Sequence, residues 1–339
     1  MAGLTEKTRL QNACKLKEVD RQPLICPGGM MNYVTCEMAN IAHIPFPEVH
    51  HDSKLMAAMA VQAHNLSGLE SYGVPFCMTV EAESMGAVVD FGDSLCEPHV
   101  VNGAIQSVSD FHQLKPMDLT CGRPKAVLDA ITILSEMDTD VPVIGNLTGP
   151  ISVAGTTLNC EILLREIRKN HDGALEYMQF ITDGVSSFGK AMVEAGADCI
   201  CIAEPTGTGE LLGPRYFDEF SVQFLNQVLD AAKAPYSVVH ICGNMTSVLD
   251  SIKNIRCDAF SVDAMTPIEK VREAAPEKAV MGNVSTFALG KAEQAEQVKR
   301  ITKAAMNHGV NIVAPACGIA TVTPLANLHA MKEVVEAGA

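Results

Sequence analysis

Short runs of β-branched and other apolar residues alternate along the chain with longer stretches in which apolar residues recur at helical spacing. This alternation is typical of a parallel sheet whose strands are joined by helical crossovers. It predicts eight strands, over residues 22–27, 69–75, 141–146, 198–203, 236–242, 259–262, 279–283 and 311–315.

Helices are predicted between these strands wherever the helical period is sustained. The clearest cover residues 172–195, 215–232 and 291–308, each with a glycine or proline near its end. Eight strands alternating with helices match a closed (β/α)8 barrel of the TIM type. Such a barrel carries its chemistry on the loops that follow the C-terminal ends of the strands, so candidate residues are sought there.

Residues 76–140 are too many for a simple crossover between the second and third strands. They contain a predicted hairpin over 87–108 and a turn-rich stretch over 115–124. Apolar periodicity resumes on both sides without a linker, which favours an insertion after the second strand over a separate domain. We therefore expect residues 1–339 to form a single barrel domain.

The composition of the chain indicates which kinds of partner and which cellular location to expect. Hydrophobic residues make up 47% of the chain and charged residues 19%, the balance of a protein with a large interior. The formal charge of −15 disfavours nucleic acid, whose binding depends on neutralising phosphates. No apolar run is long enough to cross a bilayer and no secretion signal is evident, so we expect no membrane partner and a cytoplasmic location. The 12 cysteines then indicate reduced thiols, metal ligands or catalytic groups.

Two predicted strands end in potential metal ligands. His240 and Cys242 are two residues apart at the end of the fifth strand, and side chains in a strand alternate, so both point the same way. Cys317 follows the eighth strand, and barrel closure brings its loop to the same mouth. One imidazole and two thiolates suit Zn²⁺, and a site with three protein ligands keeps a fourth position open for a substrate.

Each of these side chains also has an ordinary explanation. A lone strand cysteine is usually core filler, and a lone strand histidine is usually a hydrogen-bonded interior group. The His-x-Cys at one strand end, combined with a Cys-Gly at another, favours the metal site. Cys199 and Cys201 lie within the fourth strand without an adjacent histidine, so we expect them to pack in the core.

Three glutamates are candidates for a tentative fourth ligand or a substrate contact. Glu204 ends the fourth predicted strand, whereas Glu81 and Glu83 follow the second. A carboxylate at the barrel mouth can visit an open zinc position, but a solvated or hydrogen-bonding role is equally consistent with the sequence. The sequence does not choose among the three.

Several segments resemble the uroporphyrinogen decarboxylase-like superfamily, and within it the methylcobamide:coenzyme M methyltransferase branch. The motifs are His-Ile-Cys-Gly-Asn at 240–244, Met-Gly-Asn-Val-Ser at 281–285 and Ala-Pro-Ala-Cys-Gly-Ile-Ala-Thr-Val-Thr-Pro-Leu-Ala-Asn-Leu at 314–328. Val-Pro-Phe-Cys-Met-Thr-Val-Glu-Ala-Glu at 74–83 and Met-Val-Glu-Ala-Gly-Ala-Asp at 192–198 add support. The resemblance spans almost the whole chain, and its most specific part is the His-x-Cys with the distant Cys-Gly-Ile-Ala.

The resemblance implies a TIM-type barrel with Zn²⁺ held by His240, Cys242 and Cys317. It implies a methylcobamide carried by a partner corrinoid protein as methyl donor, and the thiol of coenzyme M as acceptor. The branch serves methanol or methylamine pathways.

Alternatives to this activity remain at this point. Residues 25–32 depart from the family pattern near the expected barrel mouth, which leaves another acceptor such as tetrahydrofolate open. A uroporphyrinogen decarboxylase is a second alternative, although its polycarboxylate substrate favours a basic pocket and residues 25–32 contain no arginine. A non-catalytic partner of a corrinoid protein with a structural zinc is a third, but structural zinc sites usually have four ligands.

Overall fold

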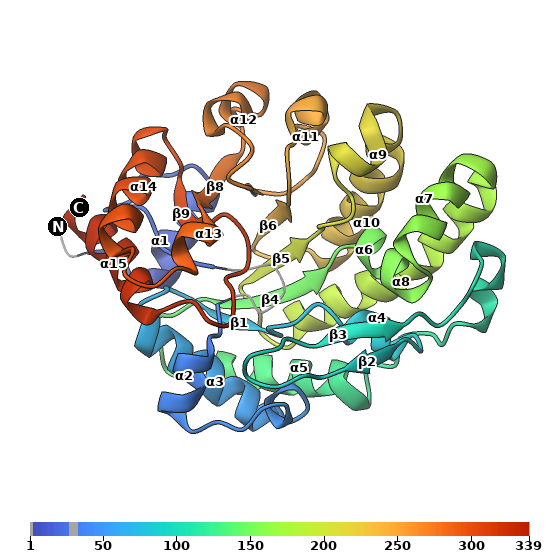
Figure 1. The fold of residues 1–339 in the computed structure, drawn as a ribbon, viewed down its shortest axis with the longest axis horizontal. Coiled ribbons are helices and arrows are strands. Elements are labelled where there is room, and N and C mark those ends of the chain that lie inside the picture. Colours follow the sequence, from blue (N-terminus) through green and yellow to red (C-terminus); the bar gives the residue numbers. More distant parts are fainter. Residues whose placement is uncertain (1–2, 27–32, 339) are drawn as a thin grey trace.

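The computed structural model describes residues 3–26 and 33–338. A curled sheet of seven parallel strands is surrounded by helices (Figure 1). Its strands run in the order β1 (Tyr72–Val74), β4 (Val143–Thr148), β5 (Cys199–Ala203), β6 (Tyr236–Ile241), β7 (Ala259–Val262), β8 (Ala279–Val284) and β9 (Ile312–Pro315). These strands correspond to the second through eighth predicted ones, and the TIM-type barrel architecture is confirmed.

The first predicted strand, 22–27, differs from the prediction. Its described part makes a single parallel bridge, between Leu24 and Val313 of β9, instead of a full strand. On its other side the carbonyl of Leu24 accepts a 2.7 Å hydrogen bond from the N–H of Glu70, just before β1. Pro23 has no N–H to contribute to a ladder, which shortens the pairing. This segment nevertheless joins β9 to the start of β1 and closes the ring; Pro27 lies outside the described residues.

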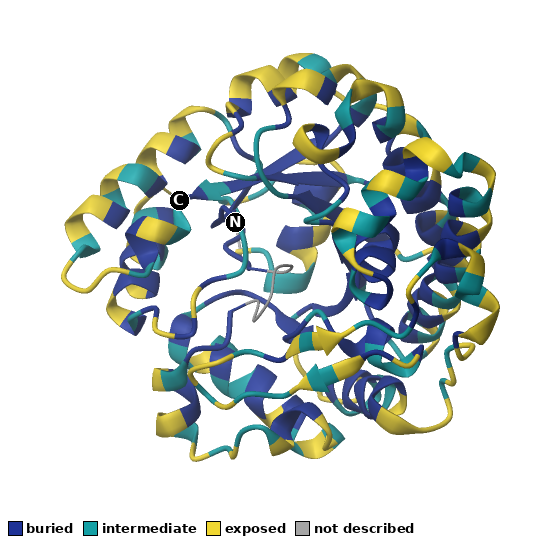
Figure 2. Ribbon diagram, turned by 45° about the vertical axis from the view of Figure 1, so that its right-hand side comes forward, coloured by how far each residue is buried: buried dark blue, intermediate teal, exposed yellow. Residues whose placement is uncertain are grey.

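The longer helices pack around the outside of the sheet, with their exposed residues facing outward and the strands buried (Figures 1 and 2). The α-helices are α1 (Glu6–Cys14), α2 (Cys36–Ala42), α3 (Ser53–Ser67), α4 (Val80–Ser84), α5 (Gly122–Ser135), α6 (Pro150–Thr157), α7 (Cys160–Lys169), α8 (His171–Glu194), α9 (Gly209–Tyr216), α10 (Gln223–Ala232), α11 (Leu249–Ile252), α12 (Ile268–Ala274), α13 (Thr286–Leu289), α14 (Ala295–Asn307) and α15 (Leu325–Ala337). Short 3₁₀ turns lie at Glu48–His50, Val108–Gln113 and Thr246–Val248.

The three predicted helices are found, each with adjusted bounds. The helix predicted over 172–195 is α8, with bounds shifted by one residue. The one predicted over 215–232 spans the end of α9, a π-helical turn at Phe217–Val222, and α10. The one predicted from residue 291 begins only at Ala295, as α14.

Apolar side chains of mixed size fill the inside of the barrel. Cys199 and Cys201 are fully buried there, and α1 packs Leu10 and Cys14 into the same cluster. The prediction that these two strand cysteines are packing residues is thereby confirmed. Because α1 contacts β6 and β9 and occupies this interior, chemistry is confined to the other end of the barrel.

The insertion after β1 contains the predicted hairpin. Strands β2 (Val88–Asp90) and β3 (His99–Asn102) pair antiparallel beside the main sheet (Figure 1). The loop between them reaches the loop that follows β9, where the hydroxyl of Thr321 donates a 2.8 Å hydrogen bond to the carbonyl of Leu95. The insertion thus borders the same mouth as Cys317. Among the described helices, none has the length and apolar character needed to cross a membrane.

Candidate metal centre

His240 points into the barrel from the C-terminal end of β6. It shares a strand face with the buried residues Tyr236 and Val238 because side chains alternate along a strand, and it is only 1% exposed. Cys242 follows immediately after β6, and its Sγ lies 3.1 Å from Nε2 of His240. The chain then turns at Gly243, whose φ of 75° is a left-handed conformation that glycine adopts without steric cost.

Cys317 completes a compact group of three soft donors. It lies two residues beyond the end of β9, and its Sγ is 3.5 Å from the Sγ of Cys242. One potential ligand atom from each of the three residues lies within 4.8 Å of the others. Among residues 3–26 and 33–338, this is the only group of three or more histidine, cysteine, aspartate or glutamate side chains with such geometry. The sequence placed all three at one mouth, and the structure brings them together.

The two sulfurs differ electrostatically. A hydrogen bond from the Cys242 thiol lowers the pKa of Cys317 well below its usual value, and the nearby His240 lowers it further, against the opposing effect of burial. The same hydrogen bond, together with burial, raises the pKa of Cys242. The contact between the two sulfurs thus favours a thiolate within the pair, and the thiolate is the form that binds metal.

Glu204 lies outside this group of donors and is occupied elsewhere. Its fully buried carboxylate accepts hydrogen bonds of 2.9 Å from the N–H groups of Ile151 and Ser152, one of 3.2 Å from Gly207, and one from the Ser152 hydroxyl. These contacts tie the end of β5 to the first turn of α6. Burial raises the pKa of Glu204 to about 7, although the hydrogen bonds oppose this shift.

The other two glutamates also have partners away from the donor group. Glu81, fully buried on α4, accepts 2.8 and 2.9 Å hydrogen bonds from the N–H and hydroxyl of Thr148 at the end of β4. Burial raises its pKa to about 7. Glu83 forms a 2.8 Å ion pair with the buried Arg123 of α5. The structure thus brings none of the three candidate carboxylates into the donor group.

A cavity of 280 Å³ opens at the same end of the barrel as the donor group. Thr79 follows β1, Thr148 ends β4 and Thr206 follows β5, while the hairpin contributes Pro98 and His99. The hydroxyl proton of Thr148 is engaged by Glu81. This cavity is the space at the mouth in which part of a substrate can lie.

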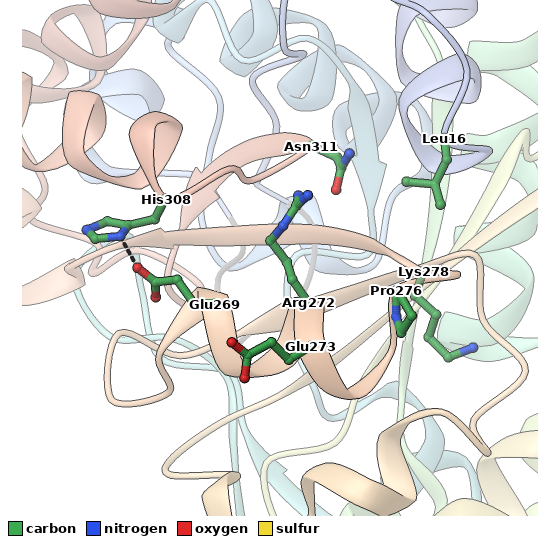
Figure 3. Close-up of a pocket in the computed structure, with 8 residues that line it drawn as sticks. All are labelled: Leu16, Glu269, Arg272, Glu273, Pro276, Lys278, His308 and Asn311. Atoms are coloured by element: carbon green, nitrogen blue, oxygen red, sulfur yellow. Dashed lines mark hydrogen bonds and ion pairs between the residues drawn. The ribbon is translucent and has the colours of Figure 1, made fainter.

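A second cavity, of 340 Å³, lies at the opposite end of the barrel (Figure 3). Its walls come from α12 and from residues that precede β8 and β9, including Arg272, Lys278 and Asn311. The N-terminal face of a barrel is associated with stability, and this cavity is separated from the donor group by the filled interior.

Sequence reasoning missed the polar residues that surround the three donors. Ser261 of β7 contacts the His240 ring, and the thiol of Cys26 lies 3.8 Å from the carbonyl oxygen of Cys317. Both follow from strand pairing, because His240 lies opposite Ser261 and residues 24–25 pair with β9. A register prediction would have found them; residue type alone gave no signal.

Comparison with known proteins adds independent information. The family model described as "Uroporphyrinogen decarboxylase (URO-D)" matches residues 5–338. The methylcobamide:CoM methyltransferase MtbA of Methanosarcina acetivorans is 32% identical over 336 residues, which cover 98% of each chain. The methylcobamide:CoM methyltransferase MtaA of Methanosarcina barkeri is also 32% identical, covering 98% of this chain and 97% of the relative. A solved methyltransferase structure from Methanosarcina mazei superposes with a TM-score of 0.89 at 30% identity and covers 99% of both chains.

Proposed function

Because the chain belongs to the uroporphyrinogen decarboxylase family, we propose that it is a zinc-dependent methyltransferase of that family. It moves a methyl group from a methylated corrinoid, carried by a partner protein, to the thiol of coenzyme M. The full-length similarity to enzymes named for this reaction supports the proposal. The observation that carries it is the group of one imidazole and two thiols at the barrel mouth.

His240, Cys242 and Cys317 hold the metal in this proposal. Their soft donor atoms suit Zn²⁺, and three protein ligands leave one coordination position for a substrate. When bound, Zn²⁺ lowers the pKa of an acceptor thiol, ordinarily about 8.5, and keeps its sulfur as the thiolate nucleophile. The two protein thiolates balance the charge of the ion, so they favour a bound sulfur that stays electron-rich. A fourth-ligand role for Glu81, Glu83 or Glu204 stays a prediction, and their present hydrogen bonds and ion pair favour a structural role.

Exposed apolar side chains around the mouth support docking of a corrinoid protein. Phe287 on α13 is 85% exposed, and Met265 and Val322 follow β7 and β9. Leu95 of the insertion, also exposed, lies next to Val322, because its carbonyl accepts a hydrogen bond from Thr321. Exposed apolar groups of this size mark protein–protein contacts when they gather at one face. The proposed metal site needs Cys242 and Cys317 as reduced thiols, so we expect a reducing location such as the cytoplasm.

The test is incubation of the zinc-loaded protein with methylcobalamin and coenzyme M, while corrinoid absorbance and methylated thiol are followed. We expect loss of the methylcobalamin spectrum and stoichiometric methyl-coenzyme M, and neither with metal-free protein. Tetrahydrofolate replaces coenzyme M in a parallel reaction. Methylation of tetrahydrofolate alone would reassign the acceptor, and decarboxylation of uroporphyrinogen without methyl transfer would reject the proposal.

A further inference from the structure

The second nitrogen of His240 has a partner that the proposed reaction does not use. Nδ1 of His240 lies 3.0 Å from Oγ of Ser261. In the parallel pairing of β6 with β7, His240 and Ser261 are direct neighbours, and both are only 1% exposed. The hydroxyl is therefore placed by the register of the sheet rather than by a loop.

We propose that Ser261 is a positioning residue that fixes the orientation and the tautomer of the His240 ring, so that the lone pair of Nε2 faces the two sulfurs. A neutral imidazole has one N–H and one lone pair, and only the lone pair can bind a metal. When Nδ1–H donates to Ser261, the lone pair is on Nε2, which lies 3.1 Å from Sγ of Cys242. The inference rests on the proposed function in one respect: it requires the zinc site at His240, Cys242 and Cys317, but not the methyl transfer.

The loop that follows β7 also supports the turn after Cys242. The carboxylate of Asp263 accepts a 3.2 Å hydrogen bond from the N–H of Gly243. The hydroxyl of Thr266 donates a 2.9 Å hydrogen bond to the carbonyl of Gly243 and accepts a 3.0 Å hydrogen bond from the N–H of Met245. The end of β7 and the loop after it therefore position two of the three donors, His240 through its ring and Cys242 through the backbone that follows it.

Rotation of the imidazole about its bond to Cβ would otherwise exchange the two sides of the ring. A half-turn would place Cε1–H where Nε2 now lies and Cδ2–H against Ser261, so that no nitrogen lone pair would face the sulfurs. A buried hydroxyl on one side removes this freedom, because turning the ring would leave the Ser261 oxygen without its partner. The metal then meets a donor that is already oriented.

The test compares Ser261→Ala with Ser237→Ala. Ser237 is also a buried strand serine, but its hydroxyl bonds Asp258 at the other end of β6, so it is a matched control. Zinc affinity is measured by competition with a chromophoric chelator, and ¹⁵N NMR of the zinc-loaded proteins identifies the bound nitrogen of His240. Urea unfolding of both metal-free variants reports any general loss of stability.

We expect Ser261→Ala to weaken zinc binding by about 10- to 100-fold while Ser237→Ala binds as the wild type does. In the wild type, zinc is on Nε2 and the Nδ1 proton exchanges slowly with solvent; in Ser261→Ala that proton exchanges rapidly. Equal zinc affinity in the two variants, or zinc on Nδ1 in the wild type, overturns the inference. If the wild type binds zinc in this way but transfers no methyl group, the proposed function fails while the role of Ser261 stands.

Discussion

Replacing Glu81 by glutamine tests whether this buried carboxylate is a structural group. Its two carboxylate oxygens accept hydrogen bonds from the N–H and the hydroxyl of Thr148. The glutamine carbonyl can accept from the N–H, and its amide can donate to the hydroxyl, because a threonine oxygen acts as donor or acceptor. The substitution therefore keeps both contacts and removes one ionisable group. We expect little change in stability at pH 5 and unchanged zinc affinity.

The change in the free energy of unfolding at higher pH follows from the pKa of Glu81. Burial raises this pKa from 4.5 to about 7, so the native state binds a proton more tightly than the unfolded state. The contribution of such a group to stability is fully present at low pH and is lost as the pH rises through the native pKa. With about 1.4 kcal/mol per pKa unit, the free energy of unfolding falls by about 2–3 kcal/mol between pH 5 and pH 8 from this group alone.

Urea unfolding of metal-free wild type and Glu81→Gln, at pH 5 to pH 8, measures this effect. The stability of the variant relative to the wild type should rise by about 2–3 kcal/mol across that range. Glu204→Gln is the comparison, because its pKa is also raised to about 7. Glu204→Gln should show the same rise with pH. However, either orientation of its amide points N–H groups at a backbone N–H, so the whole curve should lie about 1–3 kcal/mol below that of Glu81→Gln. A pH-independent difference for Glu81→Gln, or loss of zinc binding, would refute the reasoning.

Three further outcomes are expected. Cys317→Ser should weaken zinc binding by more than about 100-fold and abolish methyl transfer, as metal analysis and turnover would report together; full zinc retention with normal turnover contradicts its role. Phe287→Ser should raise KM for the corrinoid protein by about 10-fold or more and leave turnover of free methylcobalamin unchanged; an unchanged KM excludes Phe287 from docking. Arg9→Leu, which removes the 2.9 Å buried ion pair with Glu70, should lower the free energy of unfolding by about 3 kcal/mol in urea titrations, whereas the exposed Lys125→Ala should change it by less than about 0.5 kcal/mol.

The strands could be predicted because a parallel barrel buries both faces of each strand. Runs such as Tyr236–Ile241 and Ala279–Val284 are buried almost throughout, which makes them continuous apolar segments in the sequence. The closing segment at residues 22–27 was overestimated for a physical reason. Its apolar residues are flanked by prolines, which fit the hydrophobic pattern but withhold N–H groups from the ladder.

The three donors could be predicted because two simple rules place them. Alternation along β6 puts His240 and Cys242 on one side, and ring closure brings the end of β9 to β6 through the shared mouth. Ser261 could not be predicted, because its contact depends on the register between β6 and β7, and a shift of one residue would turn it away from the ring.

The glutamates show where residue type alone is ambiguous. A carboxylate at a strand end has the same sequence signature whether it binds a metal, caps a helix or joins two loops. In the structure Glu81 joins α4 to the end of β4, and Glu204 joins the end of β5 to α6. These bonds fix the loops after three adjacent strands, β1, β4 and β5, which lie beside the donor group in the ring. In the proposed metal site, carboxylates that hold the wall of the mouth in place would leave a coordination position open beside the three soft donors, and the proposed reaction requires that position for its thiol.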